Sequence, residues 1–100
     1  MKVVWTDRAK LRLREIQEYI AAESPRIAPE VVRRLVTRSR QLATLPLSGR
    51  AVPEYRRDDI RELLERPYRI IYLVLPGQQR VDVLTVRHYR QLLPSDLTQL

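Results

Sequence analysis

The sequence predicts an α+β fold: a single domain with the element order β-α-α-β-β-β, in which a helical hairpin packs on one face of an antiparallel sheet. Two observations carry this prediction. The segment from Ile60 to His88 contains two apolar runs, YRIIYLVL and VDVLTV, on either side of Pro76-Gly77. β-branched residues and Tyr favour strands, and Pro-Gly favours the turn between them. The first half of the chain instead repeats apolar residues at helical spacing. Two helices packed on one face of the sheet would bury the apolar residues of both the helices and the strands.

Length and composition limit the class of protein. A chain of 100 residues is expected to form one domain, residues 1–100, and 44% hydrophobic with 31% charged residues is typical of a folded globular protein. The N-terminus lacks the apolar stretch of a signal peptide, and no run approaches the length of a membrane span. We therefore expect a cytoplasmic protein with no membrane partner.

Several chemistries lack the residues that they need. The chain has no cysteine and one histidine, which excludes disulfides and thiolate chemistry and argues against a zinc site. With Gly49 and Gly77 as its two glycines, it has no glycine-rich phosphate loop. We therefore expect no metal and no cofactor.

The net charge of +7 is nearly all arginine, since Lys2 and Lys10 are the only lysines. Arginine binds phosphate and carboxylate groups with two parallel hydrogen bonds, so nucleic acid or an acidic protein surface is one expected partner. The other interpretation is that a GC-rich genome favours arginine codons and the charge keeps the protein soluble. The charge alone does not choose between them.

The first elements are a strand and a helix. Lys2 to Trp5 is a short apolar run, and Thr6 is expected to cap a helix whose dipole Asp7 favours. This helix should end by Ser24, because Pro25 disfavours helical geometry in the residue before it. Its core face is an apolar stripe at spacings of four, three and four: Ala9, Leu13, Ile16 and Ile20.

A second helix should become regular by Pro29, after a loose first turn. Its core face is predicted to consist of Val32, Leu35, Val36, Ser39 and Leu42. Two prolines, Ser48 and Gly49 then indicate a loop from Leu45 to Pro53.

The remaining strands are predicted at Ile60–Leu64, Tyr68–Leu75 and Val81–Val86. The last two form the hairpin, and because they are apolar on both faces, they should lie centrally in the sheet. The tail from Tyr89 to Leu100 contains Pro94-Ser95-Asp96 as a cap. We expect it to form a short helix or to become ordered on binding.

Several motifs resemble the RelE/ParE superfamily of bacterial toxins. They are IREL, PYRIIY and a VxVLxVxH strand followed by a basic segment, and the upstream VVWTDRAKLRLREIQEYI and LATLPLSGRAVPE also fit. The resemblance covers nearly the whole chain. It implies the toxin of a type II toxin–antitoxin pair, held silent by its cognate antitoxin. We expect that antitoxin to be acidic, partly disordered when free, and to cover the sheet as an amphipathic helix or an added strand.

One chemistry fits the polar residues: metal-free cleavage of RNA, in which a 2′-OH attacks its own phosphate. It needs a base, an acid and cations that stabilise the charge on the phosphorane. Glu54 is the candidate base, and His88 is the candidate acid, because imidazole is the side chain best suited to exchange a proton near neutral pH. Arg61 and Arg69 would bind the phosphate, and Tyr89 would stack on a base or donate a proton.

The resemblance implies roles for some of these residues. In the YoeB-like ribonuclease branch, a Glu after the loop, an Arg in a strand and a His-Tyr pair after the last strand are catalytic. The matching positions here are Glu54, Arg69 and His88-Tyr89.

Two departures favour another branch of the superfamily. RelE-type ribonucleases use lysines in their site, whereas no lysine follows Lys10 here, and their helical hairpin is shorter than the segment Thr6 to Leu45. The long hairpin resembles the ParE branch, which poisons DNA gyrase by binding. We therefore expect a gyrase-binding toxin. The alternatives are a ribosome-dependent endoribonuclease acting on mRNA, and a non-toxic nucleic-acid-binding module whose affinity falls steeply with salt.

Each candidate residue also has a purely structural interpretation. Glu54 could be an ordinary loop carboxylate, and His88 a strand-end residue bonded to the backbone. The arginines could be held in ion pairs between neighbouring strands, Arg61 with Glu62 and Arg69 with Asp82; an exposed pair contributes ~1 kcal/mol or less. Two tyrosines are expected in the core, Tyr68 and Tyr72.

Overall fold

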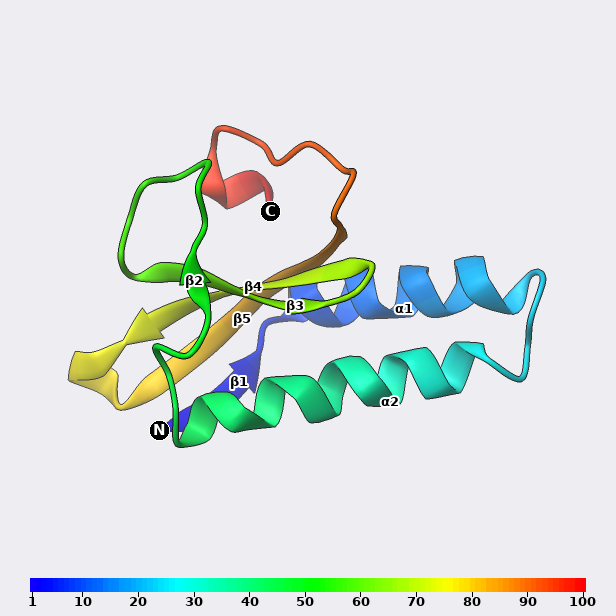
Figure 1. Ribbon diagram of the computed structural model, residues 1–100, viewed down its shortest axis with the longest axis horizontal. Coiled ribbons are helices and arrows are strands. Elements are labelled where there is room, and N and C mark those ends of the chain that lie inside the picture. The colour runs from blue at the N-terminus through cyan, green and yellow to red at the C-terminus, as the bar shows by residue number, and fades with distance from the viewer.

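The computed structural model describes residues 1–100 as a five-stranded sheet, a helical hairpin and a C-terminal tail (Figure 1). The elements are β1 (Lys2–Trp5), α1 (Asp7–Ala21), α2 (Ala28–Ser39), β2 (Arg50–Ala51), β3 (Ile60–Glu65), β4 (Tyr68–Leu75) and β5 (Arg80–His88). Short 3₁₀ turns occupy Arg40–Ala43, Pro76–Gln78 and Leu97–Gln99. The two helices lie on one face of the sheet and the tail runs over the other, which confirms the α+β prediction. Neither helix combines the length and the apolar character that crossing a membrane requires.

The sheet is mixed, and here the prediction of a purely antiparallel sheet was wrong. The strand order is β1-β5-β4-β3-β2, with β4 and β5 central as expected. β1 pairs with β5 in the parallel direction, Lys2 opposite Arg80, while the other pairs are antiparallel. Strand direction depends on which distant segments pair, and no local pattern in the sequence encodes it. The two-residue strand β2 lies inside the segment that was predicted to be a loop.

The predicted cap of the first helix is confirmed, and it also joins the helix to the sheet. The Thr6 hydroxyl accepts a hydrogen bond from the Ala9 N–H at 3.1 Å, which satisfies one of the free donors of the first turn. The same hydroxyl donates to the main-chain oxygen of Val83 at 3.0 Å. Because β1 ends at Trp5, opposite Val83, the rest of the outer edge of β5 is left to α1.

The larger apolar cluster lies between the helices and the sheet. It contains Leu35 and Leu42 of the hairpin together with Tyr72 of the sheet, and the predicted stripe of α1 belongs to it. On α2 the predicted core residues Leu35 and Ser39 are buried, but Val31 is buried in place of the predicted Val32, which is half-buried. The predicted loose start is confirmed, since residues 25–27 form turns and the helix is regular from Ala28; burial of Ala28 sets the stripe at residues 28, 31, 35 and 39.

A smaller cluster lies on the opposite face and is closed by the tail. It contains Val52, Ile60, Ile71 and Leu100. The tail is anchored by Tyr55, whose hydroxyl donates to the main-chain oxygen of Pro94 at 2.7 Å. The predicted cap is confirmed at Asp96, which accepts from the Thr98 N–H at 2.9 Å, although it begins a single 3₁₀ turn.

A β-bulge in β5 decides where its last side chains point. Up to Val83 the strand pairs regularly with β4, and then one extra residue enters, so that His88 lies opposite Tyr68. Since side chains alternate across a strand, one added residue reverses the face of all that follow. Val86 and His88 therefore face α1. Arg87 points to the other face, where it donates to the main-chain oxygen of Leu100, and it also borders the groove beside α1.

Candidate functional site

A groove of about 750 Å³ crosses the sheet face that does not carry the helices. This sheet groove is lined by Arg50, Pro53, Glu54, Leu64, Arg66, Pro67, Tyr68, Arg69 and Tyr89. It brings together three of the predicted site residues: Glu54, Arg69 and Tyr89. The other two, Arg61 and His88, do not line it.

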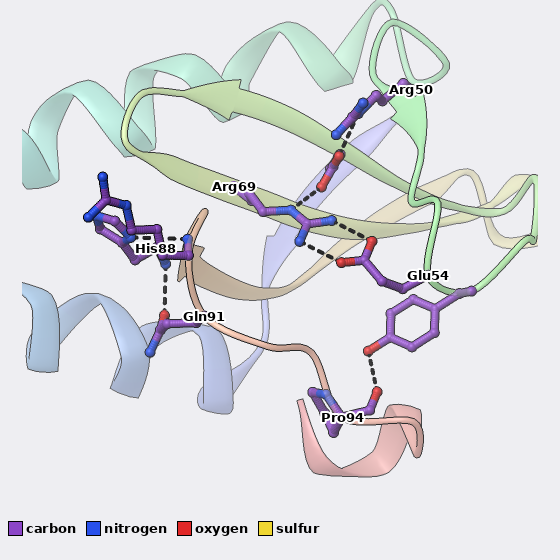
Figure 2. A network of polar contacts seen from close by, with 9 residues as sticks. Arg50, Glu54, Arg69, His88, Gln91 and Pro94 are labelled. Carbon is purple, nitrogen blue, oxygen red and sulfur yellow. Dashed lines mark hydrogen bonds and ion pairs between the residues drawn. The ribbon is translucent and has the colours of Figure 1, made fainter.

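Arg69 forms the floor of the groove and is held by two carboxylates (Figure 2). Its Nη1 and Nη2 donate to the two oxygens of Glu54, both at 2.8 Å, and its Nε donates to Glu62 at 2.5 Å. Every nitrogen of the guanidinium is therefore bound to a carboxylate. The hydrogen bonds that Arg69 donates to Glu54 raise the pKa of Arg69, so the group stays charged.

Glu62 connects this pair to a second arginine. Its side chain is fully buried, and its other oxygen accepts from the Arg50 Nε at 2.6 Å. A buried carboxylate needs such partners, because water is not there to solvate it. Arg50 itself is 60% exposed and presents its outer side to the groove. The result is a chain of alternating charges, Arg50–Glu62–Arg69–Glu54.

Glu54 lies at the solvent end of this chain. Its side chain is 43% exposed, and the hydrogen bonds from Arg69 hold its pKa below the ordinary value. An ionised carboxylate is what a general base requires, but here both oxygens already accept hydrogen bonds from Arg69.

His88 lies on the other side of the sheet, apart from Arg69 (Figure 2). Its ring packs edge-on against Tyr68, with 5.9 Å between the centroids. Nδ1 accepts a hydrogen bond from the Arg90 N–H at 3.2 Å, and the His88 N–H donates to the Gln91 side chain at 2.7 Å. This is the bonded strand-end environment that had been one of its two interpretations.

Tyr89 follows the last strand and turns back over the groove. Its side chain is 53% exposed, and its ring stacks on His88 with centroids 4.8 Å apart. The Arg90 guanidinium lies 5.6 Å from the Tyr89 centroid, within reach of a cation–π contact. Tyr89 thus offers an aromatic surface beside the arginines of the groove.

Arg61 supports a loop on the helix side of the sheet. Its Nε donates to the main-chain oxygen of Gly49 at 2.8 Å, and its Nη atoms donate to the oxygens of Asp58 and Leu47. The geometry gives this side chain a role in fixing the loop before β3.

Two predicted ion pairs were wrong, and the strand register explains both. Asp82 pairs with Arg80 on its own strand at 2.7 Å, and Arg69 lies opposite Arg87. Arg61 and Glu62 are neighbours on one strand, so they point to opposite faces. The core positions of the tyrosines are confirmed for Tyr72, which is fully buried, while Tyr68 is half-buried between two grooves.

Sequence reasoning missed the residues that complete this site. Glu62 and Arg50 belong to it because of the pairing of β2 with β3, where Arg50 lies opposite Glu62. A two-residue strand gives no detectable pattern in the sequence. The one usable signal was a charge in the middle of the apolar run IRELL, which indicates a buried partner.

The family assignment follows from comparison with known proteins. Residues 3–93 match the model of the ParE toxin family of type II toxin–antitoxin systems, parDE. The chain is 39% identical over 98 residues to "Putative toxin Y4kP" of Sinorhizobium fredii, covering 96% of each protein. It is 37% identical over 92 residues to toxin RelE2 of Caulobacter vibrioides, covering 91% of this chain and 98% of the relative.

Solved structures agree on the fold. A chain of the chromosomal ParDE system from P. aeruginosa has a TM-score of 0.74 at 23% identity, with 88% of this chain and 95% of that chain covered. A chain of the RelBE2 toxin–antitoxin complex from Mycobacterium tuberculosis has a TM-score of 0.55 at 24% identity, with 87% and 95% covered. The family match and the two relatives extend over nearly the whole chain. This chain therefore belongs to the ParE toxin family of type II toxin–antitoxin systems.

Proposed function

We propose that this toxin inhibits bacterial growth by binding and poisoning DNA gyrase, without chemistry of its own. The observation that carries the proposal is the separation of the acid–base set. Each nitrogen of Arg69 already donates to a carboxylate, and the single histidine lies across the sheet from it. A general acid must reach the leaving group from the side on which the substrate binds, and His88 does not line the groove that holds Arg69.

The hairpin supports the same proposal. α1 has 15 residues and α2 has 12, and both extend beyond the edge of the sheet (Figure 1). A binding toxin needs a stable surface, and a long hairpin supplies one that a compact catalytic site does not require.

Purified gyrase provides the test. Relaxed plasmid is incubated with gyrase and ATP, with and without the toxin, and then treated with detergent and protease. The proposal expects loss of supercoiling and an increase in linear DNA. The variants Glu54→Gln and His88→Ala should retain this effect, since they remove the candidate base and acid. Full supercoiling with no linear DNA, at a toxin concentration that stops growth in cells, would remove gyrase as the target.

We also propose an acidic antitoxin as the partner of the sheet groove. The groove presents Arg50 and Arg66 beside two exposed apolar side chains, Leu64 at 41% and Tyr89 at 53% exposure. An acidic, amphipathic segment that is disordered when free would match both the charge and the apolar surface.

Co-expression with the neighbouring open reading frame tests this partner. We expect one heterocomplex on size-exclusion chromatography. Arg66→Glu should weaken the association more than Arg33→Glu does, because Arg33 lies on α2, outside the groove. Separate elution of the two chains at micromolar concentration would count against the partner. If both variants weakened the association equally, the sheet groove would not be the binding site of the antitoxin.

A second candidate function is ribosome-dependent cleavage of mRNA. It is favoured by one observation, namely that Glu54, Arg69 and Tyr89 line the same groove with two further arginines. In this alternative, RNA would have to displace Glu54 from Arg69 to free a phosphate-binding cation. It predicts that Arg69→Lys and Tyr89→Ala abolish growth inhibition while the protein remains folded.

A further inference from the structure

A second groove, of about 470 Å³, lies between α1 and the end of β5. Its walls include Arg12, Tyr19, Tyr68, Arg87 and His88, and we call it the α1 groove. It shares only Tyr68 with the sheet groove. Its size falls within the range of small-molecule sites.

Arg87 is a half-buried cation with no aspartate or glutamate partner. Of the other arginines in strands, Arg50, Arg69 and Arg80 each pair with an acid, and Arg61 makes three hydrogen bonds to main-chain oxygens. Arg87 instead makes one hydrogen bond, from Nη2 to the main-chain oxygen of Leu100 at 3.2 Å, and its buried Nε has no partner. Burial lowers the pKa of Arg87, and the nearby charge of Arg12 adds to this. Taking a cation out of water is costly, and one hydrogen bond leaves the buried Nε of Arg87 unsatisfied.

Arg12 adds a second cation to the same groove. Its Nη1 donates to Glu15 at 3.1 Å, in a pair exposed at the groove rim, while its buried Nε has no partner. Exposed ion pairs of this kind contribute little stabilisation, and the single carboxylate of Glu15 does not neutralise both arginines. An oxyanion between Arg12 and Arg87 would neutralise two like charges at once.

The remaining walls are aromatic. Tyr19 is 82% exposed on α1, and Tyr68 and His88 form an edge-on pair across from it. A carboxylate ligand needs no such surface. Nucleobases stack on tyrosine and histidine rings, and this stacking accepts any base.

From these observations we propose that the α1 groove binds a nucleotide unit, with its phosphate between Arg12 and Arg87 and its base against Tyr19 and Tyr68. The ligand is either a free nucleotide or one unit of a single strand. This site lies outside the sheet groove and does not depend on the gyrase proposal. The net charge of +7 would draw either ligand to the protein.

Binding measurements on the whole chain test the site. The probes are adenosine monophosphate and inorganic phosphate, followed by calorimetry, and a short fluorescein-labelled oligothymidylate, followed by anisotropy. Arg12→Gln should weaken nucleotide binding about tenfold or more, as expected for a charge-assisted hydrogen bond. Arg33→Gln removes the same charge from α2, outside the groove, and should change the affinity less than about twofold. Tighter binding of the oligonucleotide identifies a strand as the ligand, and equal binding identifies a free nucleotide.

Two further variants test separately the binding of the base and the binding of the phosphate. Tyr19→Ala should weaken the binding of the oligonucleotide and of the mononucleotide at least about fivefold, because a base stacks on this ring. The binding of inorganic phosphate, which has no base, should be unchanged. Arg87→Lys keeps the charge but loses the planar fork, and should weaken all three probes. Circular dichroism verifies that each variant is folded.

Three results would overturn the proposal: equal loss for Arg12→Gln and Arg33→Gln, no binding of any probe, or tighter binding of an oligoglutamate peptide than of the oligonucleotide.

Discussion

Arg69 bonds to two carboxylates that lie in different surroundings. Glu62 is fully buried and Glu54 is 43% exposed, so the same guanidinium forms one pair in the protein interior and one at the surface. A buried carboxylate depends on its partner far more than an exposed one, because removal of the partner leaves an uncompensated charge. We therefore regard the Glu62 bond as structural, and the Glu54 bond as the one that a ligand could replace.

Substitution of Arg69 tests the buried pair. Arg69→Gln should destabilise the protein by about 3 kcal/mol, because Glu62 keeps only Arg50 as a partner. Arg57→Gln, which breaks the exposed pair with Asp59, should destabilise the protein far less, because solvent screens that pair. Urea unfolding measures both variants. Equal costs would mean that the buried charge chain contributes no more than a surface pair.

The exposed ion pair between Glu54 and Arg69 should make a pH-dependent contribution to the free energy of unfolding. Arg69 lowers the pKa of Glu54 from its ordinary value of 4.5, so the folded state binds this proton less readily than the unfolded state. The stabilisation is therefore complete above pH 4.5 and is lost as the pH falls through the lower, folded-state pKa. At neutral pH it should be about 1 kcal/mol or less, because the carboxylate is partly exposed.

The measurement compares wild type with Glu54→Gln in urea unfolding across the acid range. The difference in free energy of unfolding between them should shrink as the pH falls. A difference that stays constant from neutral pH to pH ~3 would show that Glu54 acts through its shape, without its charge.

Gly49 is required by a close approach of two strands. A Cβ at this position would lie 2.3 Å from the Glu62 main-chain oxygen and 2.7 Å from the Tyr72 hydroxyl, which accepts the Gly49 N–H. Gly49→Ala should thus cost about 2 kcal/mol or more in thermal unfolding. Gly77→Ala, where the added Cβ meets nothing, should stay within about 0.5 kcal/mol of wild type. The two variants are matched in chemistry, so equal effects would contradict the close approach.

At the scale of elements, the tail completes the core on the second face. Leu100 is 2% exposed against Val52, Ile60 and Ile71, whereas Leu92 is 93% exposed. Without the tail, these three side chains would face water or a binding partner. The tail is therefore the element through which a partner on this face would act on stability.

A pair of leucine variants tests the tail. Leu100→Ala should cost about 2–3 kcal/mol, because it opens a cavity in the smaller cluster. Leu92→Ala should be neutral within about 0.5 kcal/mol. The measurement is urea unfolding monitored by Trp5 fluorescence. A neutral Leu100→Ala would mean that the tail does not pack in solution.

The bulge in β5 is the element-scale feature that separates the candidate acid from the candidate phosphate-binding arginine. With a regular register, the alternation from Val83 would place His88 on the face of Arg69. The run VDVLTVRH contains no glycine or proline that would mark a bulge, and its alternation is apolar on both faces. The sequence therefore predicted the strand correctly but could not predict the direction of its last side chain.

At the scale of the whole molecule, local patterns predicted the elements well, and long-range pairing decided the site. The Thr6 cap, the apolar stripe of α1 and the Tyr68–Leu75 strand rest on neighbouring residues, and the structure confirms them. The partners of Arg69 come from β3 and from the loop after β2, and the predicted ion pair with Asp82 was wrong for that reason. Charge–charge distances depend on register, and a single sequence does not encode register locally.

The ParE family, the long hairpin and the divided acid–base set together support a toxin that acts as a binder. The whole-molecule consequence is that growth inhibition should depend on surfaces and should be insensitive to the loss of His88. Its most direct alternative is RNA cleavage on the ribosome, and that alternative leaves a physical product.

The most direct measurement is primer extension on an mRNA that is being translated in a cell-free system, with and without the purified toxin. We predict an intact message, at toxin concentrations that trap gyrase on DNA. New cuts within codons that require ribosomes, and that disappear with His88→Ala, would contradict this account. They would make the protein a ribonuclease whose groove reorganises on the ribosome to bring His88 to Arg69.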